Sequence, residues 1–390
     1  MKSLHYCFFC ANYLPNLGGV ERYTYNLAKK LVAAGNQVTV VTSNVFALEE
    51  QETVDGIEII RLPCFKLLGG RFPVLKPNRD FRRLNAMLKK RKFDFAVIQT
   101  RFYVHSGYAA LYCKRMGIPG IVIEHGTNHF TVNNPVLDFV GSIYEHFITF
   151  VIRRCRSDFY GVSQACCDWL KHFKIQAKGR LYNAVDPDEI ERNLAACTKS
   201  YREELGLQDS VIVTYTGRLV REKGIQKLVD AVTELNKSNS RIKLLVAGDG
   251  DLFEQIKQQS HPNVILLGRL NFDEIIALLK ETDVFCLPTD YPEGFPTSVL
   301  EAAAAKCYIV TTTKGGSKEL ILDETYGAIL TDNSVKEIAD AILRAVTDQP
   351  YRISAAEKSC QRLRDNFTWD CISREVIALA EEAVQSSTPV

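Results

Sequence analysis

The sequence predicts an α/β protein with two doubly wound parallel sheets in succession. Short apolar runs rich in β-branched residues alternate with amphipathic helical segments through both halves of the chain, which is the pattern of parallel βαβ units. At 390 residues and 46% hydrophobic content, the chain exceeds the ~250–300 residues at which a single core stops growing. Two domains, each with its own sheet, are therefore expected.

The first half contains six strand-like runs and one well-delimited helix. The helix Val20–Ala34 ends at Gly35, where a glycine cap is expected. Because βαβ connections are right-handed, these runs should form one parallel sheet. The predicted strands are His5–Ala11, Gln37–Thr42, Glu58–Leu62, Phe95–Gln99, Gly120–Glu124 and Asp158–Val162.

The second half repeats the alternation after a boundary expected near Tyr182–Asn193. Apolar periodicity predicts helices at Ile225–Leu235, Phe272–Glu281 and Val335–Thr347. The predicted strands are Val211–Thr216, Lys243–Ala247, Val264–Leu267, Val284–Leu287, Ile309–Thr312 and Ala328–Leu330.

Composition favours a reduced, cytoplasmic protein. The twelve cysteines are scattered, and Cys7 and Cys10 would point to opposite faces of a strand, so neither a disulfide nor joint metal binding is expected there. No apolar stretch approaches the ~20 residues needed to span a bilayer. The N-terminal segment lacks a small-residue cleavage pattern, so a first buried strand is expected rather than a signal peptide.

Charge is unevenly distributed although the net charge is only +2. Residues 1–180 hold 25 basic and 13 acidic side chains, whereas residues 181–390 hold 23 and 33. Much of the basic excess lies in Arg71–Lys92, where Phe81, Leu84, Met87 and Leu88 form an apolar stripe. Such a helix favours contact with an anionic membrane surface. The basic residues proposed for this contact, on the acceptor side, are Arg79, Arg82, Arg83, Lys89 and Lys90.

Two other interpretations of the charge remain. The apolar stripe of Arg71–Lys92 could pack on its own domain, in part or entirely. A second candidate for membrane contact is the apolar segment Phe139–Arg156. Glu145 and His146 interrupt it, so we expect a packed helix with a basic end rather than an anchor, and membrane contact is the alternative. No helix-turn-helix or single-strand stacking signature accompanies the charge, and nucleic-acid binding is therefore disfavoured.

A glycine-flanked pair of cations follows the strand Val211–Thr216. The segment Gly217–Gly224 carries Arg218 and Lys223 at the carboxyl end of that strand. Glycine lets the backbone turn tightly and a ligand approach closely. Arg as a bidentate fork and Lys as a point charge suit a diphosphate. A solvated charge cluster is the plainer alternative.

Two glutamates, Glu293 and Glu301, stand eight positions apart around a Gly-Phe-Pro turn. Pro296 and Thr297 should open a helix, whose first N–H groups make an anion site. One carboxylate could then bind sugar hydroxyls and the other ribose hydroxyls, with a diphosphate between them. A solvated glutamate pair on an ordinary strand–loop–helix unit is the alternative.

Taken together, these motifs resemble the retaining glycosyltransferases of family 4, which have the GT-B fold. The two segments Gly217–Gly224 and Glu293–Glu301 carry most of the resemblance, and their order and spacing make it specific. Weaker supporting pieces extend over nearly the whole chain; they are Gly18–Arg22, Glu124–Thr127, Asn183–Asp186 with Ala184 in place of glycine, and Phe367–Trp369.

The resemblance implies two Rossmann-like domains facing a cleft, with the closing helix Cys371–Gln385 returning to the first domain. Residues 1–182 plus 371–390 would form the acceptor side, and residues 183–370 would bind the nucleotide sugar. The implied catalytic residues are His125, Arg218, Lys223 and Glu293. The implied donor-binding residues are Gly18, Gly19, Gly217, Arg218, Lys223, Gly248, Arg269, Glu293, Gly294, Phe295, Pro296, Thr297 and Glu301.

The resemblance also implies a hexose-type transfer with retention, to a glycan or lipid-linked acceptor in surface polysaccharide or glycolipid biosynthesis. The leaving diphosphate would be stabilised by fixed cations and N–H dipoles. No metal is expected, because Asp188 and Asp251 of the two Asp-x-Asp pairs are interpreted as helix caps. No cofactor is expected beyond the nucleotide sugar, which is the substrate.

Rival functions remain open. Gly248-Asp249-Gly250 follows a strand, but Phe253 breaks the dinucleotide fingerprint, which disfavours a nicotinamide dehydrogenase. A GT-B-fold sugar-nucleotide epimerase would turn over the donor with no second substrate. A non-catalytic sugar-nucleotide-binding subunit would bind the donor and show no turnover.

Overall fold

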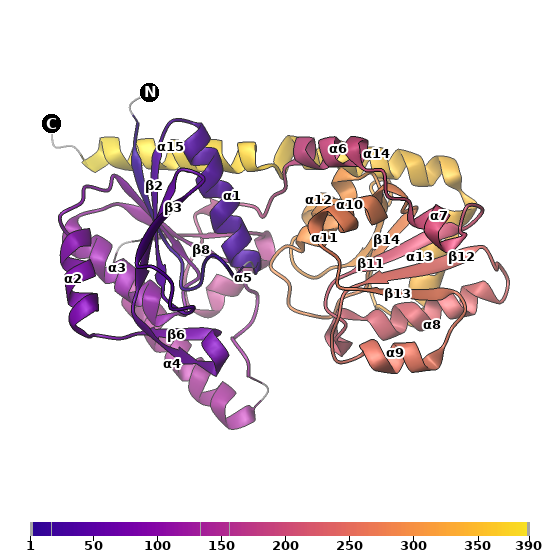
Figure 1. Ribbon diagram of the computed structural model, residues 1–390, viewed down its shortest axis with the longest axis horizontal. Helices are drawn as coiled ribbons and strands as arrows, with labels where there is room; N and C mark the ends of the chain where they lie inside the picture. Colours follow the sequence, from indigo (N-terminus) through magenta and orange to yellow (C-terminus); the bar gives the residue numbers. More distant parts are fainter. Residues whose placement is uncertain (1–2, 17, 133, 156, 388–390) are drawn as a thin grey trace. The chain divides into compact units, whose positions relative to one another are not determined.

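The computed structural model describes residues 3–387 except 17, 133 and 156, and it divides the chain into two compact units (Figure 1). Unit 1 comprises Met1–Asn183 and Trp369–Val390, and unit 2 comprises Ala184–Thr368. Each unit is a parallel sheet covered by helices. The predicted α/β class with two doubly wound sheets is confirmed.

Unit 1 is built on an eight-stranded sheet in which only β3 runs antiparallel to its neighbour. The order reverses between β1 and β7, so a switch point lies at the ends of these two strands. A separate hairpin pairs β5 (Cys64–Leu67) with β6 (Phe72–Leu75). In sheet order the strands are β10 (Gly179–Arg180), β9 (Asp158–Gly161), β8 (Gly120–Glu124), β7 (Phe95–Gln99), β1 (His5–Phe9), β2 (Gln37–Ser43), β4 (Ile57–Leu62) and β3 (Gln51–Val54).

Among the described residues of unit 1, an apolar cluster lies between the sheet and several of its helices. It joins residues of β1, β4 and β7 to Leu84 of α2, Ala110 of α3 and Leu170 of α5. The C-terminal helix α15 packs on α1, where Tyr23 and Trp369 meet edge to face at 5.1 Å. The helices are α1 (Gly19–Ala33), η1 (Leu68–Gly70), α2 (Arg79–Leu88), α3 (Val104–Met116), α4 (Pro135–Arg153), α5 (Gln164–His172) and α15 (Trp369–Ser387).

The basic helix α2 uses its apolar stripe inside its own unit. Leu84 and Leu88 are fully buried, and Phe81 and Met87 pack against the same cluster. The basic side chains at positions 79, 82, 83, 89 and 90 are exposed. The packed-stripe interpretation of this helix is therefore correct, and α2 offers charge but no apolar face.

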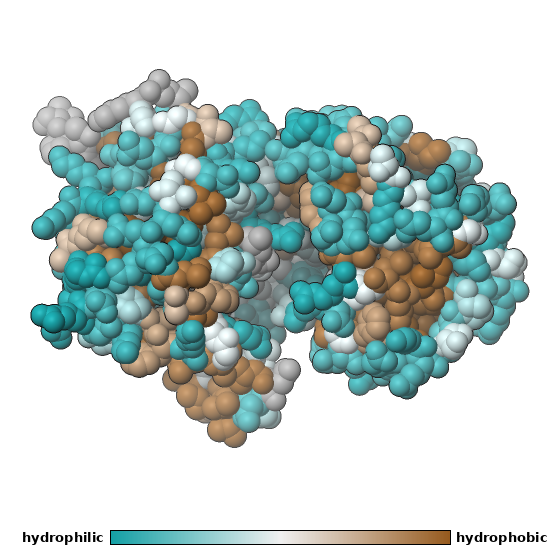
Figure 2. Space-filling view, viewed as in Figure 1, coloured by the Kyte–Doolittle hydropathy of each residue, from teal (hydrophilic) through white to brown (hydrophobic). Residues whose placement is uncertain are grey.

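Helix α4 has the opposite arrangement, which corrects the expectation of a packed helix. Its buried side chains are Glu145, Thr149 and Ile152. Hydrophobic side chains cover its outer face, as the brown area at the lower end of unit 1 shows (Figure 2). This 19-residue helix also meets the length and composition of a membrane span, contrary to the expectation that no segment would. The residues at least half exposed are Val136, Leu137, Phe139, Val140, Ile143, Phe147 and Phe150.

Unit 2 is built on a six-stranded, fully parallel sheet whose order reverses between β11 and β14. In sheet order the strands are β13 (Val264–Gly268), β12 (Ile242–Ala247), β11 (Val211–Thr216), β14 (Val284–Leu287), β15 (Tyr308–Thr312) and β16 (Ala328–Leu330). The helices are α6 (Pro187–Ala196), α7 (Tyr201–Leu205), η2 (Arg221–Lys223), α8 (Ile225–Asn236), α9 (Phe253–Gln259), α10 (Phe272–Lys280), α11 (Thr297–Ala304), α12 (Ser317–Leu320), α13 (Val335–Thr347) and α14 (Gln349–Asn366).

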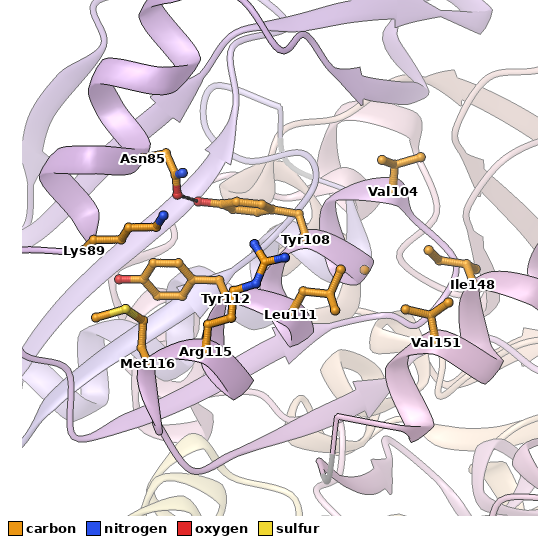
Figure 3. Close-up of a pocket in the computed structure, with 11 residues that line it drawn as sticks. Asn85, Lys89, Val104, Tyr108, Leu111, Tyr112, Arg115, Met116, Ile148 and Val151 are labelled. Atoms are coloured by element: carbon orange, nitrogen blue, oxygen red, sulfur yellow. Dashed lines mark hydrogen bonds between the residues drawn. The ribbon is translucent and has the colours of Figure 1, made fainter.

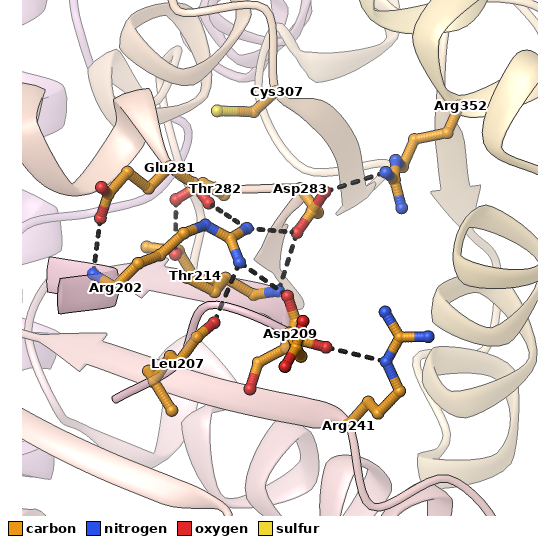
Figure 4. Close-up of polar contacts among 12 residues, drawn as sticks. Arg202, Leu207, Asp209, Thr214, Arg241, Glu281, Thr282, Asp283, Cys307 and Arg352 are labelled. Carbon is orange, nitrogen blue, oxygen red and sulfur yellow. Dashed lines mark hydrogen bonds and ion pairs between the residues drawn. The ribbon is translucent and has the colours of Figure 1, made fainter. Parts of the chain in front are cut away.

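Asp283 fixes the pairing of β11 with β14 at their amino ends (Figure 4). Its carboxylate accepts hydrogen bonds from the Ile212 backbone and from Arg202, both at 2.9 Å, and pairs with Arg352 at 2.9 Å. The Asp283 backbone N–H also donates to Ile212 O at 3.0 Å. This contact fixes the register of β11 and β14 at their amino ends. The segments that leave the carboxyl ends of the two strands are therefore held next to each other.

Candidate functional site

The candidate site of unit 2 lies at the switch point of its sheet. Segments that follow β11 and β14 leave the carboxyl ends of two adjacent parallel strands. In open α/β sheets, ligands bind outside such strand ends, where the strand order reverses. Arg218 and Lys223 follow β11, and Glu293 follows β14.

Two glycines shape the turn that carries the cations. Gly217 has φ +149° and Gly224 has φ +74°, values that L side chains rarely adopt. A Cβ at Gly224 would lie 1.8 Å from Pro288 O. The turn after β11 therefore touches the segment after β14, and only glycine fits at this contact.

Backbone hydrogen bonds fasten the two segments together. The Glu222 carbonyl oxygen accepts from Asp290 N at 2.7 Å and from Tyr291 N at 2.9 Å. Glu293 N in turn donates to Tyr291 O at 2.8 Å. These bonds place the side chain of Glu293 beside that of Lys223.

The structure gathers Arg218, Lys223 and Glu293 around one tyrosine ring. Lys223 Nζ forms a close ion pair with Glu293 Oε1, and Thr289 Oγ1 donates to the same oxygen at 3.2 Å. The Lys223 ammonium lies 5.3 Å from the Tyr291 ring centre and the Arg218 guanidinium 5.5 Å. Arg218 is exposed, Lys223 is half-buried and Glu293 is buried, so the group faces solvent through its two cations.

The glycine and aromatic candidates nearby have structural contacts of their own. A Cβ at Gly248 would lie 1.8 Å from Gly217 O, so these two turns touch. The carbonyl oxygen of Gly294 accepts from Gly316 N at 3.0 Å. Phe295 is buried and meets Phe367 edge to face at 5.3 Å, so its ring belongs to the core.

The remaining candidates of unit 2 lie on α11 and after β13. Helix α11 begins at Thr297 with Pro296 as its N-cap, and in the described part of the chain no side chain caps it. Glu301 lies one turn further along α11 and is half-buried. Arg269 follows β13, two strands from β11 in the sheet, and is exposed.

The candidate histidine of unit 1 follows β8. His125 Nε2 lies 2.6 Å from Gln99 Oε1, and its ring meets Tyr23 edge to face at 4.8 Å. Burial lowers the pKa of His125 to about 3, so the imidazole is neutral near pH 7. An Nε2–H donor to Gln99 leaves the Nδ1 lone pair available to a hydroxyl.

The buried acid before His125 holds its loop. Glu124 Oε1 accepts from the backbone N–H groups of His125 and Gly126, each at 3.1 Å. The other oxygen of Glu124 pairs with Arg101 at 2.9 Å. The carboxylate therefore orients the backbone at His125.

The glycines before α1 have different surroundings. Gly18 is the N-cap of α1, and a Cβ there would lie 2.5 Å from Glu21 Oε2. Asn16 also donates to Glu21 at 3.3 Å, and burial raises the pKa of that carboxyl. Gly19 has open space at its Cβ position. Thus Gly18 makes room for Glu21, whereas Gly19 leaves the helix start accessible.

Comparisons with known families agree with this geometry. Residues 198–366 match the glycosyl transferases group 1 family, and residues 17–189 match glycosyltransferase family 4. The chain belongs to these glycosyltransferases. Each match covers one of the two sheet-forming parts of the chain.

Individual relatives are distant but match most of the chain. The phosphatidylinositol N-acetylglucosaminyltransferase GPI3 subunit of Saccharomyces cerevisiae is 24% identical over 86% of this chain and 74% of its own length. The capsular polysaccharide biosynthesis glycosyltransferase CapM of Staphylococcus aureus is 22% identical over 69% of this chain and 74% of its own. Anabaena HepE, crystallised with UDP and glucose, has a TM-score of 0.73 at 17% identity, covering 97% of this chain and 99% of its own. The predicted GT-B fold is confirmed.

The helix-cap assignments in this glycosyltransferase need correction. Asp186, not Asp188, caps α6 by accepting from the backbone at Asp188 and Glu189, at 3.2 and 3.0 Å. Asp188 pairs with Arg364 at 2.8 Å. The N-cap of α9 is Leu252 without a side-chain bond, so Asp251 is not a cap. In both cases the chain enters its helix one or two residues away from the expected position.

Sequence reasoning missed several residues of the glycosyltransferase that surround the candidate side chains. Tyr291 and Thr289 contact the cations or Glu293 in unit 2. Gln99 and Tyr23 contact His125 in unit 1. Gln99 is the last residue of a predicted strand that pairs with β8. Its place at a strand end could have marked it as a neighbour of His125. Nothing in the sequence pattern distinguishes the others.

Proposed function

We propose that this glycosyltransferase moves a hexose-type sugar, with retention, from a nucleoside diphosphate sugar to a glycan or lipid-linked saccharide acceptor. The observation that carries the proposal is the convergence of Arg218, Lys223 and Glu293 at the switch point of unit 2. HepE, of like fold, was crystallised with UDP and glucose, which supports a nucleotide sugar as the donor here.

The ion pair of Lys223 with Glu293 is suited to an exchange of partners. A diphosphate carries more negative charge than one carboxylate, so it should draw Lys223 and the exposed Arg218 toward itself. Glu293 is then released to accept hydrogen bonds from the sugar hydroxyls. When the donor binds, the ion pair between Lys223 and Glu293 is thereby replaced by a contact of the cations with the diphosphate and a contact of Glu293 with the sugar.

The segment Gly294–Thr297 and Glu301 are proposed to complete the donor site. The uncapped start of α11 offers backbone N–H groups to the phosphates. Glu301 is proposed to bind the ribose hydroxyls, and Gly217, Gly248 and Arg269 to border the nucleoside.

The chemistry follows from the charges. As the bond from sugar C1 to the diphosphate oxygen breaks, negative charge grows on that oxygen, and Arg218 and Lys223 stabilise it without a metal. A departing phosphate oxygen takes the acceptor's proton on the same face, which gives retention. Loss of one such stabilising donor typically costs ~3–4 kcal/mol.

On the acceptor side, neutral His125 is proposed to contact the transferred sugar through Nδ1. Gly19, with open space at its Cβ position, is proposed to let the acceptor or a donor phosphate approach the backbone of α1. Gly18 would act only through the position of Glu21. The neutral imidazole can accept a hydrogen bond from a sugar hydroxyl without adding charge beside the reacting carbon.

A lipid-linked acceptor is supported by a groove of about 300 Å³ between α2, α3 and α4 (Figure 3). Apolar side chains of α3 and α4 line it, together with Lys89 and Arg115. An apolar wall with two cations suits a lipid that carries phosphate. GPI3 is named for a phosphatidylinositol acceptor and CapM for capsular polysaccharide, in keeping with glycolipid or surface polysaccharide biosynthesis.

Peripheral binding at the inner face of a membrane is proposed to use α4 and α2 together. Glu145 of α4 is tied to Arg101 inside unit 1 at 3.0 Å, which favours a helix that lies in the interface over one that spans the membrane. Its exposed apolar face would enter the headgroup region, and the basic residues of α2 would meet anionic lipid.

The proposal is tested by a thermal-shift screen with UDP-, GDP- and ADP-linked sugars, followed by transfer assays with lipid-linked saccharides. We expect one nucleotide series to raise Tm and its sugar to reach an acceptor. An isomerised donor formed without acceptor would instead indicate an epimerase. No shift with any donor would contradict the assignment.

A further inference from the structure

Three histidines of unit 1 converge from three different segments. His129 lies in the loop after β8, His146 lies on α4, and His172 is the last residue of α5. Their ligating nitrogens all lie within 4.8 Å of one another. In the described part of the chain, this is the only such group of three or more metal-ligating side chains.

A buried carboxylate orients the first of these rings. Glu145 Oε2 lies 3.0 Å from His129 Nδ1 and 3.0 Å from Arg101 Nη1. Arg101 is held from its other side by Glu124. A carboxylate that accepts from Nδ1–H leaves the Nε2 lone pair free, which is the usual arrangement behind a metal-binding histidine.

The other two rings are also prepared to act as ligands. His172 stacks on Trp169 with an interplanar angle of 5° at 4.8 Å. The His146 ring centre lies 4.9 Å from that of His172 and 5.8 Å from that of His129. Neutral imidazole is the form that binds metal.

We propose that His129, His146 and His172 bind a Zn²⁺ ion, with water as a fourth ligand. Three imidazoles without thiolate or a direct carboxylate ligand suit Zn²⁺ among the common divalent ions. Zn–N bonds of about 2.0–2.1 Å require the nitrogens to close in from their present spacing. His146 and His172 are exposed, so their side chains are able to rotate toward His129.

The ion would fasten the loop after β8 to α4 and α5. That loop begins at His125, but the ligands are separate from Arg218, Lys223 and Glu293 of unit 2. The inference therefore does not depend on the proposed transferase chemistry. Its effect would be on the stability of unit 1 and on the order of the loop.

The test uses the full chain without a histidine tag, freed of metal by chelation. Zn²⁺ is titrated by calorimetry, and Co²⁺ is added separately to follow the visible absorption of a four-coordinate site. We expect one ion per chain and a higher Tm with Zn²⁺. His146→Ala and His172→Ala should each weaken binding by more than about 100-fold, since losing an outer partner alone costs ~10–100-fold.

His261→Ala is the matched control, because His261 is the single histidine of unit 2. It should leave both stoichiometry and affinity unchanged. Circular dichroism of the metal-free variants shows whether they fold. The proposal is overturned if the folded protein binds no Zn²⁺, or if folded His146→Ala and His172→Ala proteins bind it as well as the parent.

Discussion

The two units carry different chemistry at the carboxyl ends of their parallel strands. In unit 2, two cations and a carboxylate stand where β11 and β14 separate. In unit 1, Gln99 at the end of β7 and His125 after β8 form a neutral group with Tyr23 of α1. The carboxyl ends of the strands thus carry a charged site in unit 2 and an uncharged polar site in unit 1. The first suits a diphosphate and the second suits sugar hydroxyls.

The largest expected effect is on the charged side of this comparison. Lys223→Ala removes a cation that is proposed to stabilise the leaving group and breaks the ion pair with buried Glu293, so transfer should fall at least ~100-fold. Steady-state transfer with the identified donor is the measurement. Lys237→Ala, at the far end of α8 with its own partner Glu234, is the control. Near-normal turnover by Lys223→Ala would break the assignment.

The next effect concerns how closely the two segments of the charged site approach. Gly224→Ala forces a Cβ to within 1.8 Å of Pro288 O in a left-handed conformation, so unfolding free energy should drop by at least ~3 kcal/mol. Gly206→Ala has a similar φ of +65° with no atom within 4 Å, and should cost only ~1–2 kcal/mol. Denaturant unfolding compares them. Equal costs would contradict the contact.

The neutral side is expected to make unit 1 sensitive to acid. Burial lowers the pKa of His105 to about 4 and of His125 to about 3, whereas unfolded histidine titrates near 6.5. Their contribution is complete above about pH 6.5 and is lost as pH falls toward 4, at ~1.4 kcal/mol per pH unit for each group.

A variant isolates this effect. Burial raises the pKa of Glu21 and Glu124, so these two carboxyls lower the stability as pH rises, opposite to the histidines. The slope of unfolding free energy against pH must therefore be compared between variant and parent. His105→Gln should flatten the pH dependence of unfolding by ~1.4 kcal/mol per unit between about pH 6.5 and 4. His261→Gln should not change it. An unchanged slope for His105→Gln would mean that this histidine is not buried neutral.

The smallest expected effect concerns the outside of unit 1. Phe139→Ser with Phe147→Ser removes two exposed rings of α4 and should weaken binding to anionic vesicles at low salt by at least ~10-fold. Sedimentation with phosphatidylglycerol vesicles is the measurement. The control, Leu322→Ser with Ile353→Ser, changes exposed residues of unit 2. Absence of vesicle binding by the parent protein would remove the membrane proposal.

Strand positions could be predicted because long apolar runs leave little choice. Runs such as Val211–Thr216 and Phe95–Gln99 have the predicted bounds. The missed strands are short or polar; β3 is mostly exposed and β10 has two residues. Their pairing is decided by neighbouring strands and not by their own sequence.

The two surface helices show a different limit. A periodic pattern indicates that a helix has two faces, but it does not say which face is covered. The sequence suggests that Glu145 interrupts an apolar helix. In the structure Glu145 lies on the buried face of α4, where Arg101 balances its charge. The rings of α4 lie outside. A pattern within the helix could not predict this pairing, because Arg101 lies 44 residues from Glu145 in the sequence.

The candidate side chains of unit 2 could be selected from glycine spacing and charge. The contacts between these side chains could not be predicted. The pairing of Lys223 with Glu293 spans 70 residues and depends on the switch point. The histidine group was missed for the same reason, since its members come from a loop and two helices.

The division of unit 1 into two stretches of chain has a consequence for synthesis. Residues 184–368 form one continuous unit, and they leave the ribosome before Trp369, which packs on Tyr23, and before Asp370, which pairs with Lys30. Unit 2 is thus able to finish folding before unit 1. The part of unit 1 that precedes Ala184 must wait for α15, and the α15-facing side of α1 stays unprotected until that helix has been synthesised.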